Sequence, residues 1–125
     1  RQPVLGICLG MQLLCKFSDE NETDCLGMLP YRVRQFESDT LKIPHTGWNN
    51  IFDLKGKLFE NVAENSYVYF VHSFYVENGA ETIAKCNYEK DFSAAIEYNN
   101  FYATQFHPEK SGATGAKILE NFLEI

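Results

Sequence analysis

Two short stretches near opposite ends of the chain carry the residue types that nucleophilic acyl transfer needs. Residues 6–12 read Gly-Ile-Cys-Leu-Gly-Met-Gln, so Cys8 lies between two glycines and follows the apolar run 3–5. Residues 106–109 read Phe-His-Pro-Glu. A cysteine can attack a carbonyl carbon, a histidine can take and return its proton, and a carboxylate can orient the histidine. The two stretches together predict a cysteine-dependent acyl-transfer enzyme.

The glycines around Cys8 predict a sharp turn from a strand into a helix. In the pattern G-x-nucleophile-x-G the nucleophile has a strained backbone at the top of a strand, and we expect that a Cβ at Gly6 or Gly10 would clash. Residues 11–17 read as a helix whose N-terminus points at Cys8, which would lower the pKa of the thiol. The free N–H of Leu9 is then the expected oxyanion donor. The pattern alone leaves open a buried structural cysteine.

The pair His107 and Glu109 follows a β-rich run at residues 101–106. Pro108 favours an extended conformation for the residue before it, and side chains two apart on an extended segment share a face. Glu109 would therefore lie beside His107, fix its tautomer and stabilise its charged form. This predicts a triad in which Cys8 is the nucleophile, His107 the base and Glu109 the orienting acid. The alternative is a surface histidine next to a solvated glutamate.

Composition limits the class of protein. The chain has 125 residues, of which 45% are hydrophobic, and its formal net charge is −6. That is enough chain for one core, so we expect a single domain over residues 1–125. The acidic balance disfavours nonspecific binding to nucleic acid, and no apolar run predicts a membrane span. The four cysteines lack a C-x-x-C spacing, which disfavours a zinc site, and we expect neither a metal nor a cofactor. A catalytic thiolate suits a reducing cytosol, so we expect no disulfide framework and a cytoplasmic location.

The remaining pattern predicts strands in the middle of the chain and a helix near each end, which favours an α/β fold. Strands are expected over residues 31–36, 67–71, 82–86 and 93–98. Asn99-Asn100 predicts a tight turn that pairs 93–98 with 101–106 as a hairpin. Residues 37–50 contain Pro44, Gly47 and two consecutive Asn, which is typical of an irregular segment.

A C-terminal helix of about 13 residues is expected from Gly112 or Ala113, with Ser111 or Thr114 as its cap. Its apolar stripe is expected to consist of Ala116, Leu119, Phe122 and Leu123. Cys15 and Cys86 lie in apolar stretches and are expected to pack as small hydrophobes, whereas Cys25 lies in a polar loop.

On these motifs the chain resembles the class I (triad-type) glutamine amidotransferases. The resemblance covers residues 3–125 and rests on PVLGICLGMQLL at 3–14, IPHTGWN at 43–49, YFVHSF at 69–74 and QFHPEKSGATGAKILENFL at 105–123. It implies a flavodoxin-like doubly wound α/β sheet, which here ends in a β-hairpin and a helix. It also implies that residues 1–125 are the C-terminal part of a single amidotransferase domain.

The resemblance implies a glutaminase that hydrolyses L-glutamine through a thioester on Cys8. The central motifs at 43–49 and 69–74 match the members that deliver ammonia to a cyclase (β/α)8-barrel in histidine biosynthesis, as one half of a heterodimer. Carried over by motif, the residues placed to bind glutamine are Gln12, Glu20, Ser73 and Phe74. Those placed to meet the partner are His45, Trp48, Asn49 and Lys110. His72 fits a structural histidine as well as it fits a substrate contact.

Two alternatives stay open. A paralogous subunit could feed ammonia to amidine formation on surface-polysaccharide sugars, because the acceptor site would lie on the partner. The chain could also be an inactive truncated fragment, since it starts at Arg1 without an initiator Met. Compared with the family, we expect it to lack the early sheet strands and a Pro-Gly-Val-Gly loop that supplies a second oxyanion donor. In that case the chain alone would release little or no glutamate.

Overall fold

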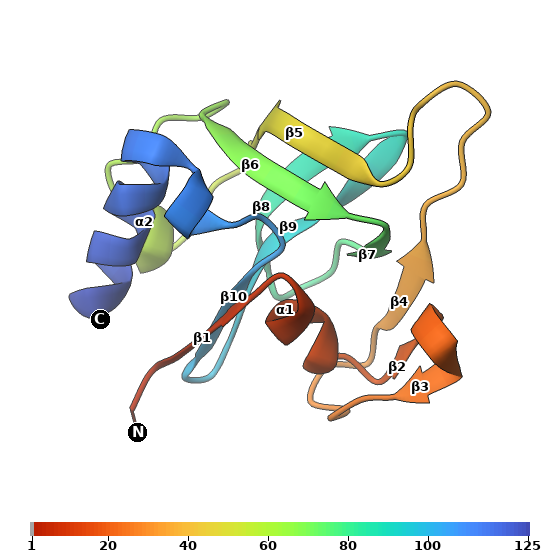
Figure 1. Ribbon diagram of the computed structural model, residues 1–125. Helices are drawn as coiled ribbons and strands as arrows, with labels where there is room; N and C mark the ends of the chain where they lie inside the picture. Colours follow the sequence, from red (N-terminus) through yellow and green to blue (C-terminus); the bar gives the residue numbers. More distant parts are fainter. Residues whose placement is uncertain (1) are drawn as a thin grey trace.

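The computed structural model describes residues 2–125, and it has strands and helices arranged as an α/β protein (Figure 1). The strands are β1 (Val4–Ile7), β2 (Phe17–Ser18), β3 (Thr23–Asp24), β4 (Arg32–Gln35), β5 (His45–Asn50), β6 (Tyr67–His72), β7 (Phe74–Val76), β8 (Thr82–Tyr88), β9 (Lys90–Tyr98) and β10 (Phe101–Thr104). The helices are α1 (Leu9–Leu13) and α2 (Gly112–Leu123), and three 3₁₀ turns are η1 (Glu20–Glu22), η2 (Lys57–Phe59) and η3 (Pro108–Lys110). The predicted α/β class is therefore confirmed.

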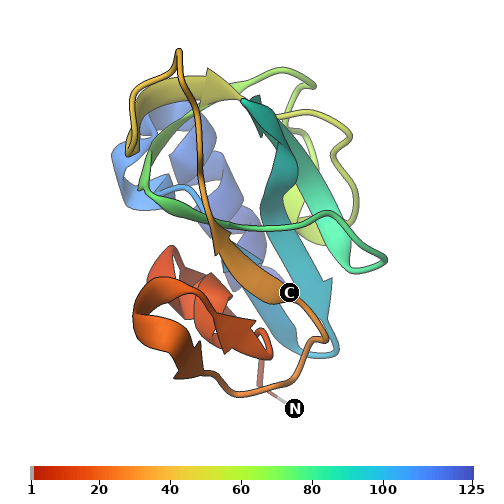
Figure 2. The same cartoon turned by 90° about the vertical axis from the view of Figure 1, so that its right-hand side faces the viewer.

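The strands form three sheets. The first has the order β1-β10-β9-β8, the second β3-β2-β4-β7, and the third is the pair β5-β6. Figure 1 shows α2 at the left of the molecule, β2 and β3 at the lower right and α1 in the lower middle, while β5 and β6 run along the top. In the second view the long connection from β4 to β5 rises along one side of the molecule (Figure 2).

The first sheet contains the predicted hairpin. β9 and β10 pair antiparallel, with Phe101 opposite Tyr98, and Asn99 has a positive φ of 54° in the turn between them. Asn tolerates this left-handed conformation better than most residues do. For this reason the two consecutive Asn residues predicted the turn correctly.

β1 and β10 are parallel, and this pairing sets the position of the site. Ile7 lies opposite Thr104, and the backbone N–H of Cys8 then donates to the Thr104 carbonyl at 2.7 Å. Parallel strands have their carboxyl ends at the same edge of a sheet. The residues that follow β1 and β10 are therefore neighbours, although about a hundred residues separate them in sequence.

Part of the segment predicted to be irregular is a strand. Residues 45–50 form β5, which pairs antiparallel with β6 along its whole length. Gly47 has a φ of 123°, which suits glycine, and Trp48 meets Tyr69 edge-on across the pair, with ring centroids 6.0 Å apart. Cross-strand aromatic contacts stabilise such pairs. The long-range partner thus overrides a local sequence that is typical of turns.

The first helix is shorter than predicted. The sequence suggests a helix over residues 11–17, but α1 ends at Leu13, and Phe17 already belongs to β2. The N–H of Lys16 donates to the carbonyl of Tyr31 at 2.9 Å, which draws this segment into the second sheet. No helix within residues 2–125 is long and apolar enough to span a membrane.

Two apolar clusters form the core. The larger packs aromatic side chains, among them Phe70, Phe92 and Phe106, between the first sheet, the β5-β6 pair and α2. The smaller surrounds Met11 and Val33 beneath α1. Buried Cys86 belongs to the first cluster and buried Cys15 to the second, as predicted, and Cys25 is only partly exposed. All four cysteines are free thiols.

The C-terminal helix α2 confirms the predicted element but not its predicted buried face. Its buried residues are Gly115, Ile118 and Asn121, whereas Leu123 is 81% exposed. Asn121 is buried because its side-chain amide donates to the carbonyls of Leu58 and Glu60, at 2.9 and 2.8 Å. A hydrogen-bonded amide can lie in a core, so the face is shifted from the one that apolar residues alone suggest.

Two glycines are required by close backbone approaches, and a third is not. A Cβ on Gly6 would lie 3.1 Å from the carbonyl carbon of Gly10, and a Cβ on Gly115 would overlap the carbonyl oxygen of Pro108. The expected clash at Gly6 is therefore present. The expected clash at Gly10 is wrong, because a Cβ there would meet nothing within 4 Å.

We predict that Gly115→Ala lowers the free energy of unfolding by about 1–3 kcal/mol, because the added methyl forces α2 away from the turn that carries His107. Gly10→Ala is the matched control. It adds the same methyl group inside α1, where alanine is favoured over glycine by up to about 1 kcal/mol. Urea unfolding of both variants measures the difference. A Gly115→Ala protein as stable as Gly10→Ala would contradict the packing described for η3 and α2.

Candidate active site

Cys8 occupies a strained turn between β1 and α1. Its φ of 56° and ψ of −103° lie outside the regions that a residue with a side chain normally adopts. Its carbonyl accepts from the N–H groups of Met11 and Gln12, which begins the helix directly after it. Strain of this kind is held in place only where the surrounding structure over-determines it. The strand-turn-helix arrangement predicted from the glycines is the one observed.

A pocket of about 310 Å³ opens beside the Cys8 sulfur, between the start of α1 and the end of β6. This volume is at the small end of the range for ligand sites. The pocket is lined by Cys8, Leu9, Gln12, Glu20, Val71, His72, Ser73 and Phe74. It therefore brings together the predicted nucleophile, the predicted oxyanion donor and all four residues predicted to bind substrate. The roles of these residues stay predictions.

His107 and Glu109 are paired, as predicted, but on a different backbone. The Nδ1 atom of His107 lies 2.9 Å from the Oε2 atom of Glu109. His107 itself is extended, as Pro108 predicts, with φ −100° and ψ 98°. The segment that follows it is the 3₁₀ turn η3, so the expected extended path through Glu109 is wrong and a tight turn brings the two side chains together. With Nδ1 bonded to the carboxylate, Nε2 is the ring nitrogen available to a nucleophile. Within residues 2–125, Cys8 has no hydrogen bond to His107.

The carboxyl group of Glu109 is ionised in this arrangement. Its partial burial raises the pKa, but the hydrogen bond from His107, its own backbone N–H and the charges of His107 and Lys110 outweigh that effect. The net pKa of Glu109 is below its usual value. A carboxylate in this state can orient the imidazole and stabilise its charged form.

The backbone of His107 is fixed by its neighbours. Its N–H donates to the carbonyl of Tyr69 at 2.9 Å, and its carbonyl accepts from the hydroxyl of Ser111 at 2.6 Å. The same hydroxyl accepts from the N–H of Tyr69 at 2.9 Å. Ser111 precedes α2 but makes no side-chain cap bond to that helix. Ser111 thus occupies the predicted N-cap position, where its carbonyl accepts from the N–H of Gly115 at 3.1 Å, but its hydroxyl ties η3 to β6.

The Cys8 thiol has a raised pKa. Burial raises it most, the N–H groups of Leu9 and Gln105 oppose this, and the charges of Glu109 and Glu20 raise it further. The predicted lowering of the pKa is therefore wrong. α1 has only five residues, and the sequence does not reveal how far the sulfur is removed from water.

Gln12 contributes to the pocket with one half of its amide. Its Nε2 donates to the carbonyl of Phe74 at 3.2 Å and to Oε1 of Gln105 at 3.0 Å, so both N–H groups are used inside the protein. The side-chain oxygen of Gln12, Oε1, has no such partner among residues 2–125. It can accept a hydrogen bond from an ammonium group in the pocket.

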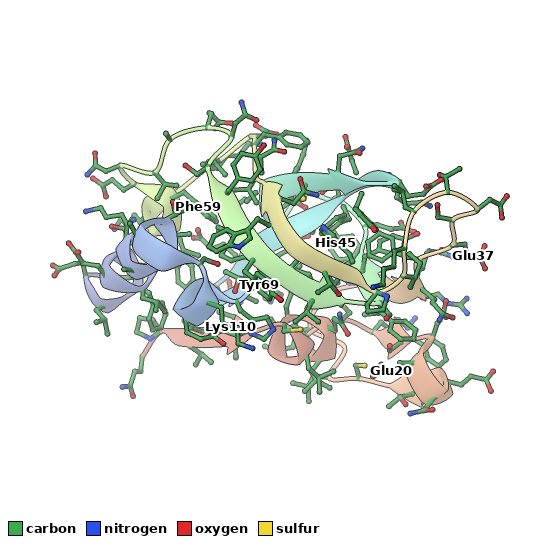
Figure 3. The ribbon with its side chains drawn as sticks, turned by 45° about the horizontal axis from the view of Figure 1, so that its top comes forward. Glu20, Glu37, His45, Phe59, Tyr69 and Lys110 are labelled. Atoms are coloured by element: carbon green, nitrogen blue, oxygen red, sulfur yellow. The ribbon has the colours of Figure 1, made fainter. Side chains whose placement is uncertain are left out.

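The residues predicted to meet a partner differ in exposure. Trp48 is 55% exposed and Lys110 is exposed on η3, which packs against β6 near Tyr69 (Figure 3). Asn49 is partly exposed. His45 is 3% exposed, with its ring stacked between Phe70 and Tyr88. This burial leaves His45 almost no surface to offer a partner and argues against the interface role predicted for it.

His45 and His72 form a buried neutral pair. The distance from His45 Nδ1 to His72 Nε2 is 3.0 Å, and His72 Nδ1 donates to the carbonyl of Phe74 at 2.7 Å. Burial lowers the pKa of His45 to about 4. Burial, and less strongly the charges of His45 and His107, lower the pKa of His72 to about 3 despite its bond to Phe74. His72 is thus a hydrogen-bonding structural histidine that also lines the pocket.

Three contributors to the site are absent from the sequence-based set. Val71 places its carbonyl 3.8 Å from the Cys8 sulfur, Gln105 places its Nε2 atom 3.5 Å from it, and Ser111 holds His107. A backbone carbonyl carries no sequence signal. Gln105 offers a weak one, since it is a polar residue inside the β-rich run that precedes His107.

The comparisons with known proteins agree with this geometry. The family model "Glutamine amidotransferase class-I" matches residues 1–125. The imidazole glycerol phosphate synthase subunit HisH of Bacteroides fragilis is 54% identical over all of this chain, which covers 65% of that protein. The protein of the same name from Escherichia coli O157:H7 is 50% identical over 99% of this chain and 64% of its own length. The chain thus spans about two thirds of the length of these relatives.

Solved structures show the same fold at lower identity. A putative GMP synthase protein from Thermoplasma acidophilum superposes with a TM-score of 0.72 at 22% identity, over 98% of this chain and 56% of that one. A glutamine amidotransferase from Thermotoga maritima gives a TM-score of 0.63 at 22% identity, over 98% and 47%.

The buried histidine pair predicts that stability falls as the pH falls from about 6.5 towards 4. In that window the unfolded chain binds protons at both histidines, whereas the folded chain excludes them. The free energy of unfolding should therefore decrease by up to about 1.4 kcal/mol per pH unit for each histidine. The His45→Phe variant keeps an aromatic ring between Phe70 and Tyr88, but it removes one of the two histidines whose protonation depends on folding.

Urea unfolding at about pH 7, 6 and 5 measures this dependence while most carboxyl groups are still ionised. The unaltered chain should lose stability over this range, and the His45→Phe variant should show a smaller slope. Stability that stays constant from pH 7 to 5 in the unaltered chain would show that the pair is not held neutral.

Proposed function

Because this chain belongs to the class I glutamine amidotransferase family, we propose that it is the glutamine-hydrolysing part of an imidazole glycerol phosphate synthase. Its substrate is L-glutamine, and its product ammonia passes to a cyclase (β/α)8-barrel subunit in histidine biosynthesis. The observation that carries the proposal is the pocket beside Cys8. A strained nucleophile, a backbone N–H and a hydrogen-bonding amide face one small cavity, and the paired His107 and Glu109 follow the adjacent strand.

The reaction begins at the sulfur. His107 takes the thiol proton of Cys8 on Nε2, and the sulfur adds to the side-chain carbonyl carbon of glutamine. The negative charge that develops on the carbonyl oxygen faces the N–H of Leu9. His107 then returns its proton to the leaving nitrogen, so that ammonia departs and a thioester remains on Cys8. Glu109 holds the imidazole in place during both transfers.

Water completes the cycle. His107 removes a proton from a water molecule, and the resulting hydroxide attacks the thioester carbonyl. The C–S bond then breaks to release glutamate, and His107 returns the proton to the leaving Cys8 sulfur. Glu20 brings its carboxylate to the pocket, and Gln12 brings its side-chain oxygen. Both groups can accept hydrogen bonds from the α-ammonium group of glutamine. Ser73 and Phe74 also line the pocket. In this proposed binding mode, the side-chain amide of glutamine lies at Cys8 and its α-carbon end lies near η1.

The choice of ammonia acceptor rests on the relatives. Proteins that are 54% and 50% identical to this chain carry the name of the imidazole glycerol phosphate synthase subunit. This favours the histidine pathway over amidine formation on polysaccharide sugars. Trp48 and Lys110, both exposed, are the side chains through which we expect the barrel subunit to be bound.

We predict a graded loss of glutaminase activity in the triad variants. Cys8→Ala and His107→Ala should each lower kcat by about 10⁴-fold or more, since they remove the nucleophile or the base. The loss of kcat in Glu109→Gln should be smaller than in the other two variants by roughly 10–100-fold, because the nucleophile and the base remain. The measurement is glutamate release with the barrel subunit present, using this chain and a form lengthened at its N-terminus with the matching residues of the Bacteroides fragilis relative.

Equal and complete loss in all three variants would assign Glu109 a role beyond orientation. No glutamate release by either unaltered form, with or without the barrel, would refute the proposed function.

We predict that Trp48→Ala weakens binding of the barrel subunit by at least about tenfold, because exposed aromatic anchors dominate interface energies. The matched control is Leu123→Ala, which truncates another exposed apolar residue at the far end of α2. Titration of each variant with the barrel subunit gives the dissociation constants. Unchanged affinity in Trp48→Ala would place the interface elsewhere on the molecule.

A further inference from the structure

We propose that Gln105 is a positioning residue for the nucleophile, holding the Cys8 sulfur through its side-chain N–H and favouring its ionised form. The inference rests on the proposed function in one respect, namely that Cys8 is the reacting group. It adds a residue that the triad does not contain and that the sequence motifs leave without a role.

The placement of Gln105 follows from the parallel pairing of β1 with β10. Cys8 comes directly after β1 and Gln105 directly after β10, so the two residues emerge side by side at one sheet edge. Gln105 is fully buried, and its backbone N–H donates to the carbonyl of Ala94 at 2.7 Å. Its side-chain Nε2 lies 3.5 Å from the Cys8 sulfur, which is within hydrogen-bonding range for sulfur.

The orientation of the Gln105 amide is fixed by its neighbours. The Phe74 carbonyl can only accept, so the Gln12 atom that lies 3.2 Å from it is the donor Nε2. The same Nε2 lies 3.0 Å from Gln105, which must therefore present its oxygen there. The nitrogen of Gln105 is left to face the sulfur. Rotating this amide would oppose two NH₂ groups and turn a carbonyl towards Cys8.

The Phe74 carbonyl is held from a second side by the buried histidines. It accepts from Nδ1 of His72, so His72 Nε2 accepts in turn from Nδ1 of His45. Nε2 of His45 accepts from the side-chain amide of Asn49 at 3.2 Å. Every bond in this series has one permitted direction, and buried networks of this kind are rigid when all members are satisfied. Gln12, and through it Gln105, is thus anchored to a fixed carbonyl.

The network matters most when the thiol loses its proton. As a thiol, Cys8 donates to the carbonyl of Val71 at 3.8 Å. As a thiolate it can only accept, so Val71 becomes a repulsive neighbour, while Gln105 and the N–H of Leu9 become its donors. The Gln105 hydrogen bond lowers the pKa of Cys8 against the larger effect of burial. Geometry and electrostatics therefore assign the same role to Gln105.

Alkylation by iodoacetamide tests this role without using glutamine. Only the thiolate reacts, and peptide mass spectrometry follows Cys8 and Cys25 separately. Gln105→Met removes the amide at similar volume, so Cys8 should react about three- to tenfold more slowly at neutral pH, the range that one hydrogen bond of ordinary strength gives. Cys25 is the internal reference, and Gln35→Met makes the same substitution at an exposed position on β4.

A second measurement needs no variant at Gln105. In the unaltered chain the ¹³Cδ resonance of Gln105 should titrate with the same midpoint as the Cys8 thiol, and Cys8→Ser should abolish that response. An unchanged Cys8 alkylation rate in Gln105→Met overturns the proposal, and so does a Gln105 resonance that stays constant while Cys8 ionises.

The two proposals fail separately. Slower Cys8 alkylation in Gln105→Met without any glutamate release from the unaltered protein supports the positioning role and refutes the glutaminase. Glutamate release by the unaltered protein, together with an unchanged Cys8 alkylation rate in Gln105→Met, supports the glutaminase and refutes the positioning role.

Discussion

The parallel pairing of β1 with β10 is the constraint on which the rest of the site depends. It places Cys8 and Gln105 at one sheet edge. The N–H of Cys8 donates to the carbonyl of Thr104, the residue before Gln105, and so holds the two segments together. His107 follows two residues later and is fixed there by β6. The hairpin from β9 to β10 supplies the second strand of the pair. A shift of register by one residue would turn each of these side chains to the opposite face.

Two carbonyl groups of β6, two residues apart, contact His107 and Cys8 respectively. The carbonyl of Tyr69 accepts from the N–H of His107, while that of Val71 faces the Cys8 sulfur. The result is a thiol that is closely held but poorly ionised, because burial outweighs the donors around it. Such surroundings keep the Cys8 thiol protonated until something changes the burial or the charges around it.

Sequence reasoning succeeded where the signal is local. The glycines around Cys8, the His-Pro-Glu order and the Asn-Asn turn each act on their immediate neighbours, and the strained turn at Cys8, the hydrogen-bonded pair of His107 and Glu109, and the hairpin are present. It failed where a distant partner decides. The strand β5, the buried position of His45, the buried amide of Asn121 and the raised pKa of Cys8 all depend on packing by residues far along the chain.

Trp48 is the only tryptophan of the chain, and its exposed ring gives the protein a built-in optical probe. An indole that is 55% exposed emits at long wavelength because water relaxes around its excited state. Tyr69 lies edge-on to it, on the strand β6, whose carbonyl groups bind the backbone N–H of His107 and face the Cys8 thiol. The fluorescence of one natural residue thus monitors the outer face of β5 and β6, next to the pocket beside Cys8, without a label.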